Sequence, residues 1–369
     1  MIRLLVVDDS PLMRRLLGGI FEAESDFTVA FARDGEEAIE KLHGFEPDVI
    51  TLDIHMPRMD GIACLDRIMI ERPCPVVMVS ARTEAGAAET MEALELGAVD
   101  FIPKPEGAVS LEIDALAPRL VEKVRGAAAA RLKPTLRLAE RIRARTGRPP
   151  AAAARPKPPL VPSKRSLPVA SRGPFRDDEG LVLVGTSTGG PQALDALLAP
   201  LPACVPWPIL VAQHMPSSFT GALARRLDKV CALDVVEVSS PVKLAGGTVY
   251  VARGDADMIL RRQNGQLVAA AAPANQAHRW HPSVDRMVAS ALTLLAPERL
   301  VGVLMTGMGN DGAGTMTELR RRGGHVIAEA EESAIVWGMP GELVRADGAD
   351  VVVPLDRIAH HLLEALQCR

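Results

Sequence analysis

The chain has 369 residues, which at about 150 residues per domain predicts two domains or slightly more. Hydrophobic residues make up 48% and charged residues 24%, as is usual for a globular domain in water. The net charge of -4 and the 3% of aromatic residues argue against a nucleic-acid binder, so we expect no nucleic-acid partner.

The five cysteines form no CxxC pair and show no metal-ligand spacing. This usage favours a reducing compartment. The N-terminal run MIRLLVV resembles a strand and lacks the pattern of a signal peptide. No apolar run approaches the roughly eighteen residues of a membrane span. We therefore expect a cytoplasmic protein without direct membrane insertion.

In the first third of the chain, short apolar runs alternate with stretches of helical periodicity, for example at 85–97. Five pairs of this kind predict a doubly wound parallel sheet in a domain over 1–125. The expected strands are 2–7, 27–31, 48–52, 75–79 and 99–102.

Polar residues follow these apolar runs directly, at the carboxyl ends of the expected strands. Ligands of parallel sheets bind at those ends. Asp8 and Asp9 follow the first run and Asp53 follows the third, so three carboxylates are expected at one edge. Such a group needs a cation, and Mg²⁺ prefers oxygen ligands. Ser80 and Lys104 end the last two runs and suit a phosphoryl group. The simpler alternative is that the paired aspartates only cap the next helix.

With LDIHMPRMDG around Asp53, this constellation resembles a response-regulator receiver domain. The resemblance implies that Asp53 accepts a phosphoryl group from a histidine kinase. It also implies that Asp8, Asp9, Asp53 and the Ile54 carbonyl bind Mg²⁺.

The same resemblance implies roles for residues around the phosphorylation site. Lys104 would pair with the phosphate, and the bond from Lys104 to Pro105 would be cis. Ser80 and Phe101 match the switch hydroxyl and the switch aromatic of the family.

Residues 126–178 differ from the rest, with 13 Lys or Arg against 3 Asp or Glu, and nine prolines. Such a segment cannot bury enough apolar surface to offset the entropy lost on ordering. We predict a basic Pro/Ala-rich linker, with a helical continuation around 136–142 left open. A simpler explanation of the basic charge is that it only keeps this segment solvated.

From 179 to 369 the alternation of strands and helices returns. Between the strands, 235–270 is rich in glycine and β-branched residues and predicts short antiparallel strands. We expect a Rossmann-like parallel-sheet catalytic domain with a short antiparallel insertion. The expected buried strands are 181–185, 209–213, 301–305, 325–329 and 350–353.

The run Gly185-Thr186-Ser187-Thr188-Gly189 matches G-x-S-x-G between a strand and a helix, the setting of a nucleophile elbow. His214 ends the next apolar run and is expected at the same edge as Ser187. Asp311 lies in a glycine-rich turn after 301–305. The order Ser, His, Asp differs from that of α/β-hydrolases, so the catalytic hypothesis depends on geometry and roles.

Each of these residues has a simpler explanation when taken alone. Ser187 and Asp311 could cap helices, and His214 could be a structural residue at a strand end. His278 and His281 precede a helix expected at about 283–296 and are second candidates for the base.

The motifs GTSTGG, AQHMP, HPSVD and TGMGNDGA resemble the catalytic domain of the chemotaxis protein-glutamate methylesterase family. The resemblance implies Ser187 as nucleophile, His214 as base and Asp311 as its orienting acid. It implies demethylation of glutamate methyl esters on the cytoplasmic helices of chemoreceptors, without a cofactor for the esterase. Further active-site positions implied by the family motifs are Thr186, Thr188 and Met308.

Three positions depart from the family pattern: His55, Asp257 and Ala330. They bear on receptor recognition and phosphoryl lifetime more than on the chemistry. Glutamine deamidation is an alternative main reaction, because one nucleophile serves both. A response regulator with a non-enzymatic output is a second alternative, although no helix-turn-helix pattern is evident.

Overall fold

The computed structural model describes residues 1–104, 109–132, 175 and 179–367. The chain divides into two compact units, Met1–Pro156 and Lys157–Arg369, and each is described here by itself. The expected cis bond before Pro105, the helical continuation at 136–142 and most of the predicted linker lie outside the described residues. The predicted domain boundaries therefore stay predictions.

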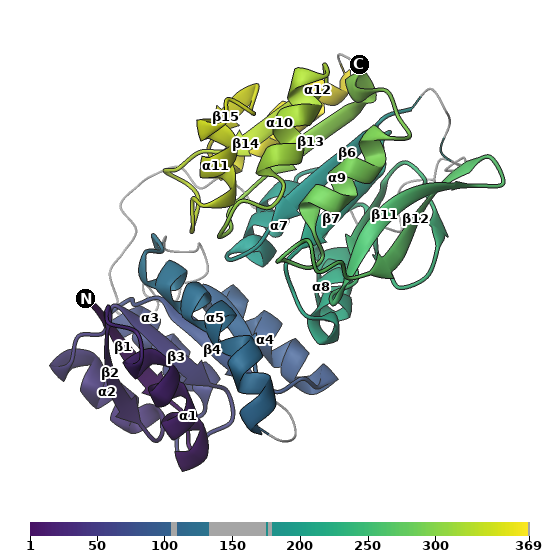
Figure 1. Cartoon of the computed structure of the whole chain (residues 1–369). Coiled ribbons are helices and arrows are strands. Elements are labelled where there is room, and N and C mark those ends of the chain that lie inside the picture. Colours follow the sequence, from purple (N-terminus) through teal and green to yellow (C-terminus); the bar gives the residue numbers. More distant parts are fainter. Residues whose placement is uncertain (105–108, 133–174, 176–178, 368–369) are drawn as a thin grey trace. The chain divides into compact units, whose positions relative to one another are not determined.

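The first unit contains a five-stranded parallel sheet with the order β2-β1-β3-β4-β5 (Figure 1). The doubly wound receiver-type fold is thus confirmed. β3 and β4 are buried along their whole length, which explains why the sequence shows continuous apolar runs there. The strands are β1 (Ile2–Val7), β2 (Phe27–Ala32), β3 (Val49–Asp53), β4 (Val76–Ser80) and β5 (Asp100–Pro103).

Four helices connect these strands and a fifth follows β5, and polar caps fix where several of them begin. Ser10 caps the first helix by accepting a hydrogen bond from the backbone N–H of Met13, and Pro11 occupies its first turn. The capping alternative for Asp8 and Asp9 is therefore wrong for this helix. The helices are α1 (Pro11–Glu22), α2 (Gly35–Gly44), α3 (Gly61–Glu71), α4 (Glu84–Leu96) and α5 (Val109–Ala128).

The second unit is built on a seven-stranded parallel sheet with the order β15-β14-β13-β6-β7-β10-β8. The chain runs outward from β6 through β7, and later from β13 through β14, so the topological switch point lies between β6 and β13. The strands are β6 (Leu181–Thr186), β7 (Ile209–Gln213), β8 (Asp234–Val238), β10 (Thr248–Ala252), β13 (Leu300–Leu304), β14 (His325–Glu329) and β15 (Val351–Val353).

The antiparallel part is smaller than the sequence predicts. β8 and β10 belong to the main sheet, where β10 pairs in parallel with both β7 and β8. Composition shows that such segments are strands but not which neighbours they meet, so the prediction failed for these two. The separate antiparallel sheet consists of β9 (Val242–Lys243), β11 (Ala256–Gln263) and β12 (Gln266–Pro273). Figure 1 shows β11 and β12 as a long hairpin.

One hydrophobic core joins the main sheet, the hairpin and three of the helices of this unit, α9 (Val284–Leu292), α10 (Ala313–Arg321) and α11 (Met339–Arg345). Phe175, inside the predicted linker, belongs to this core and donates its backbone N–H to the Leu244 carbonyl at 3.0 Å. In the described part of the chain, no helix is both long and apolar enough to cross a membrane. The helices are α7 (Gly190–Leu198), α8 (Ser217–Val230), α9 (Val284–Leu292), α10 (Ala313–Arg321), α11 (Met339–Arg345) and α12 (Leu355–Gln367).

Candidate phosphorylation site and candidate active site

Strand register brings the predicted carboxylates of the first unit together. Val7 pairs with Leu52, so Asp8 and Asp53 follow at adjacent strand ends. One carboxylate oxygen from each of Asp8, Asp9 and Asp53 lies within 4.8 Å of the others. Asp8 and Asp53 are buried, whereas Asp9 is exposed.

The donor set fits the expected Mg²⁺. Asp8 Oδ2 is buried and accepts no hydrogen bond, which leaves an oxygen for a cation. Burial raises the pKa of Asp8, and the Asp53 charge raises it further. Burial also raises the pKa of Asp53, although the neighbouring Lys104 ammonium opposes that shift, so a bound cation would further stabilise the two ionised carboxylates. The Ile54 carbonyl accepts the backbone N–H of Gly61 at 2.7 Å. A Cβ at Gly61 would lie 2.0 Å from the Asp53 carbonyl oxygen, so only glycine fits there.

Lys104 lies against two of these carboxylates. Its Nζ is 2.7 Å from Asp53 Oδ2 and 3.4 Å from Asp8 Oδ2. Although burial alone would lower it, the contacts with Asp53 and Asp8 raise the pKa of Lys104, which keeps the ammonium charged. A fixed positive charge beside Asp53 is available to pair with a phosphoryl group.

The two predicted switch residues lie behind this site. The Ser80 hydroxyl donates to the Gly86 carbonyl in the first turn of α4 at 3.1 Å. Phe101 is buried, and the Lys123 ammonium lies 5.3 Å from its ring centroid. Ser80 thus contacts α4, and Phe101 contacts a cation on α5.

His55 lies at the mouth of the site, as expected. Its backbone N–H points to Asp53 Oδ1 at 3.4 Å, and its Nε2 is 3.0 Å from Glu89 Oε2 on α4. The imidazole thus pairs with Glu89, a residue that sequence reasoning missed because the contact joins a loop to a distant helix.

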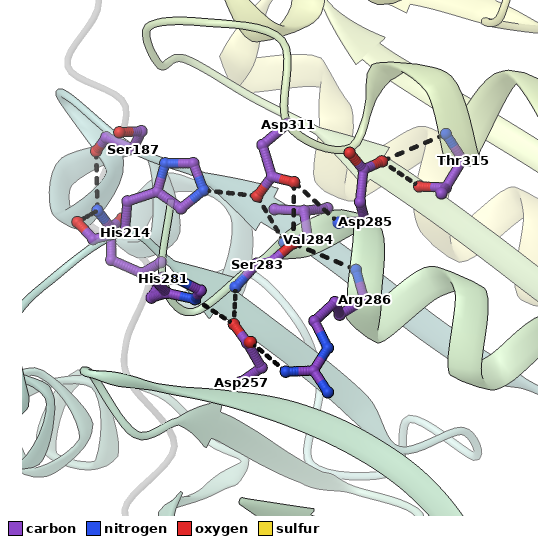
Figure 2. Close-up of polar contacts among 11 residues, drawn as sticks. Ser187, His214, Asp257, His281, Ser283, Val284, Asp285, Arg286, Asp311 and Thr315 are labelled. Atoms are coloured by element: carbon purple, nitrogen blue, oxygen red, sulfur yellow. Dashed lines mark hydrogen bonds and ion pairs between the residues drawn. The ribbon is translucent and has the colours of Figure 1, made fainter. Parts of the chain in front are cut away.

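In the second unit, register brings the predicted triad together. Thr186 pairs with Gln213, so Ser187 and His214 leave adjacent strands β6 and β7 side by side. His214 Nε2 donates to Asp311 Oδ2 at 2.8 Å, and all three side chains are buried. Figure 2 shows the imidazole between Ser187 and Asp311. His214 Nδ1 is buried and has no hydrogen-bond partner among the described residues, which leaves it available to a serine proton.

The N-terminus of α9 holds the Asp311 carboxylate. Asp311 accepts the backbone N–H of Val284 at 2.6 Å and that of Asp285 at 3.0 Å, and the Ser283 hydroxyl at 3.1 Å. Burial alone would raise the pKa of Asp311, but the hydrogen bonds from His214 and from these amides lower it. Asp311 is therefore held as an anion at a helix N-terminus. The HPSVD motif thus supports the acid, a role that sequence reasoning did not assign.

Asp257 anchors the segment that leads into α9 (Figure 2). This buried carboxylate is 2.8 Å from His281 Nδ1 and 2.5 Å from the Arg286 guanidinium, and accepts the Ser283 backbone N–H at 2.7 Å. Burial alone would raise the pKa of Asp257, but these three contacts lower it. His281 thus pairs with Asp257, and His214 is the histidine that pairs with Asp311.

Thr306 braces the turn that carries Ser187. Its carbonyl accepts the Ser187 backbone N–H at 2.9 Å and the Thr186 hydroxyl at 3.0 Å, and its own hydroxyl donates to the Thr188 carbonyl at 2.9 Å. The predicted positions Thr186 and Thr188 thus hold the turn in place. Because the Ser187 amide is engaged, it is not available to an oxyanion in this arrangement.

Met308 lies half-buried in the turn after β13. The neighbouring Gly307 approaches the nucleophile so closely that a Cβ would lie 2.7 Å from Ser187 Cβ. No hydrogen bond joins the Met308 backbone N–H to a described residue. This amide is therefore a candidate donor to an oxyanion.

Gln213 is a further site residue that sequence reasoning missed. Its buried side-chain amide donates to the carbonyls of Ser187 at 2.9 Å and His214 at 3.1 Å. A Cβ at Gly190 would lie 1.8 Å from Gln213 Oε1, so glycine is needed where α7 begins. The AQH motif contains this glutamine directly before the histidine, which is the signal that could have found it.

Together these features define a class of protein: a receiver-type unit joined in one chain to an α/β unit in which a serine, a histidine and an aspartate follow neighbouring strands of one sheet, as in serine hydrolases of the Ser-His-Asp type. Comparison with known families agrees. Residues 4–114 match the response regulator receiver domain, and residues 182–362 match the CheB methylesterase family.

The chain also resembles named relatives along almost its full length. It is 54% identical to protein-glutamate methylesterase/protein-glutamine glutaminase 2 of Rhodopseudomonas palustris, covering 99% of this chain and 98% of the relative. It is 49% identical to the corresponding protein 3 of Rhodospirillum rubrum, covering 98% and 95%. A solved catalytic domain of CheB methylesterase from Thermotoga maritima is 36% identical, with 50% of this chain and 98% of that chain covered and a TM-score of 0.49. The chain belongs to the protein-glutamate methylesterase/protein-glutamine glutaminase family, which confirms the resemblance drawn from its motifs.

Proposed function

We propose that this protein is a phosphorylation-activated serine hydrolase that demethylates glutamate methyl esters on chemoreceptors, within a chemotaxis-type pathway. The observation that carries the proposal is the alignment of Ser187, His214 and Asp311 at the switch point of the sheet. Membership of an enzyme family disfavours the alternative of a response regulator with a non-enzymatic output.

The geometry supports a two-step mechanism. His214 Nδ1, which has no hydrogen-bond partner among the described residues, takes the Ser187 proton as Ser187 Oγ attacks the ester carbonyl. The Met308 amide would donate to the oxyanion. Asp311 accepts from Nε2 and stabilises the imidazolium. The intermediate collapses when the carbon–methoxy oxygen bond breaks, and His214 gives its proton to the leaving group to release methanol. Water activated by His214 then hydrolyses the glutamyl-serine ester and frees Ser187.

Phosphorylation of Asp53 would control the esterase activity. A histidine kinase of the same pathway would supply the phosphoryl group. Asp8, Asp9 and Asp53 would hold Mg²⁺, which neutralises charge between carboxylates and phosphate when it is bound. Lys104 would pair with a phosphate oxygen from its place beside Asp53. The esterase chemistry itself uses side chains and backbone amides of the second unit and calls for no cofactor.

Glutamine deamidation is a second candidate reaction, because the relatives carry both names. The steps are the same, with ammonia as leaving group instead of methanol. One experiment separates the two: purified protein is mixed with receptor membranes bearing methylated glutamates and unmodified glutamines, with and without a small phosphodonor and Mg²⁺.

We expect methanol release that the phosphodonor accelerates. Ammonia without methanol would assign deamidation as the main reaction. Neither product, from protein whose receiver takes up phosphate, would contradict the proposed function.

A further inference from the structure

The imidazole of His214 has an aromatic partner that the proposed mechanism does not use. The indole of Trp280 stacks on it, with ring centroids 5.6 Å apart and ring planes 11° from parallel. Trp280 lies in the segment between β12 and α9. On another side it contacts the turn that carries Asp311, since a Cβ at Gly309 would lie 3.1 Å from the indole Nε1. The ring is therefore held against both the base and the turn of its orienting acid.

This stack acts differently on the two charge states of the base. A general base of this kind becomes an imidazolium when it takes the serine proton. A cation over the face of an aromatic ring is attracted by the ring quadrupole, and tryptophan is the strongest such partner. Because His214 is only 6% exposed, water does little to screen that attraction. An interaction that favours the charged form stabilises the transition state more than the ground state.

We propose that Trp280 is a positioning residue for the base, and that its π face stabilises the imidazolium form of His214 in both steps of the reaction. The inference rests on the proposed role of His214 as general base. Packing alone is the competing explanation, because a ring of this size would also keep the imidazole aligned.

Several charged groups surround His214 and Trp280. Asp311 favours the imidazolium directly, and Asp285 and His278 lie with Asp311 in one cluster within 4.8 Å. Arg279 opposes it, since its guanidinium lies 5.1 Å from the Trp280 ring centroid. Nearby, Asp257 pairs with both His281 and Arg286. Only a change confined to the electrons of the Trp280 ring leaves all these groups in place.

Such a change is available through site-specific incorporation of fluorinated tryptophans at position 280 of the full chain. One, two or three fluorines withdraw electrons from the π face stepwise while the ring keeps nearly its shape. We expect kcat/KM for methanol release to fall stepwise, by about 2- to 30-fold in total. The pH at half-maximal kcat/KM on the acid side should move downward, by up to about one unit.

Two variants complete the experiment. Fluorination at Trp207, a buried ring beside Gly180 at the opposite end of β6 from Ser187, should leave both readouts unchanged. The change from Trp280 to leucine (Trp280→Leu) should shift the acid-side midpoint in the same direction as full fluorination. Thermal unfolding of each protein checks that the fold is intact.

Equal rates and midpoints across the fluorinated series would overturn the inference. So would a lower rate with an unmoved midpoint, which would assign Trp280 a packing role. A Ser187→Ala control separates this from the proposed function: if that variant stays active, the serine mechanism itself fails. If it is inactive while fluorination has no effect, only the role of Trp280 fails.

Discussion

Buried carboxylates serve both predicted sites, and their hydrogen bonds decide their charge. Asp311 accepts two backbone amides, the Ser283 hydroxyl and the His214 ring, so its pKa is lowered and it stays ionised. Asp8 is equally buried but has one oxygen without a hydrogen bond, and its pKa is raised. The surroundings of Asp311 favour a carboxylate that stays ionised, whereas those of Asp8 favour a carboxylate that binds a cation reversibly.

The nucleophile can be tested with a matched pair of serines. Ser187→Ala should reduce methanol release by a factor on the order of 10⁶, because the attacking oxygen is lost. Ser240→Ala, at an exposed position, should retain the full rate. The measurement is methanol released per enzyme from receptor membranes. If the Ser187 variant kept most of its rate, the serine-esterase mechanism would be wrong.

Asp8 gives a prediction about stability and pH. Because its folded-state pKa is raised, its ionised form destabilises the fold, and this cost grows as pH rises through the unfolded and then the folded pKa. Asp8→Asn should therefore raise the melting temperature of the first unit by a few degrees at neutral pH without divalent ions, or about 1 kcal/mol. Calorimetry at pH 4 and pH 7 should show the gain only at the higher pH.

The Mg²⁺ dependence is the control for that change. Added Mg²⁺ should stabilise the wild type and have little effect on Asp8→Asn, since one of its ligands is gone. Equal Mg²⁺ stabilisation of both proteins would exclude Asp8 as a ligand.

His55 gives a third prediction at this scale. His55→Glu places a carboxylate beside Glu89 and near Asp53, so it should change the lifetime of the acyl phosphate. The measurement is loss of label from phosphorylated protein between about pH 6 and 8, where histidine titrates. His55→Glu combined with Glu89→Gln should move the lifetime part of the way back. Decay curves identical to wild type across that range would reject a role for His55.

At the scale of elements, helix α9 links the antiparallel hairpin to the active site. Its first residues hold Asp311, and Asp257 at the start of β11 anchors those residues. The insertion is thereby part of what positions the triad. This explains why the HPSVD motif matters although it contributes no member of the triad.

Ser283 is the residue of α9 that tests this link. It accepts the Arg286 backbone N–H as N-cap and donates to Asp311. Ser283→Ala should cost about 1 kcal/mol of stability and also lower kcat several-fold. Asp60→Ala removes the N-cap of α3 and should cost similar stability with no loss of basal kcat. Equal basal kcat in the two variants would show that Ser283 acts on the helix alone.

At the scale of the whole molecule, the chain joins a unit that can carry a phosphoryl group to a unit that can cleave esters. Asp53→Asn cannot form the acyl phosphate, so a small phosphodonor with Mg²⁺ should activate the wild type several-fold and leave this variant at its basal rate. The measurement is methanol release with and without the donor. Equal activation of both proteins would place control elsewhere than Asp53.

Removal of residues 1–125 tests whether the unphosphorylated receiver inhibits the catalytic unit. If the unphosphorylated receiver inhibits, as the family resemblance implies, the truncated protein should exceed the basal rate of the full chain. A truncated protein no faster than the unphosphorylated full chain would favour activation through positive contacts instead.

The sequence by itself determined much of this protein. Buried parallel strands leave continuous apolar runs, and their carboxyl ends share one edge, so Asp53, Ser187, His214 and Asp311 could be assigned to two sites before any coordinates. Motifs within short loops are readable because the turn and its side chain are neighbours in the chain.

Only the tertiary structure decided which distant residues support those sites. The contacts of Glu89 with His55, of Thr306 with the Ser187 turn, and of Trp280 with His214 join segments far apart in sequence. The parallel placement of β8 and β10 is of the same kind, because a strand's composition does not specify its neighbours. Such contacts depend on how complete elements pack, which no local pattern encodes.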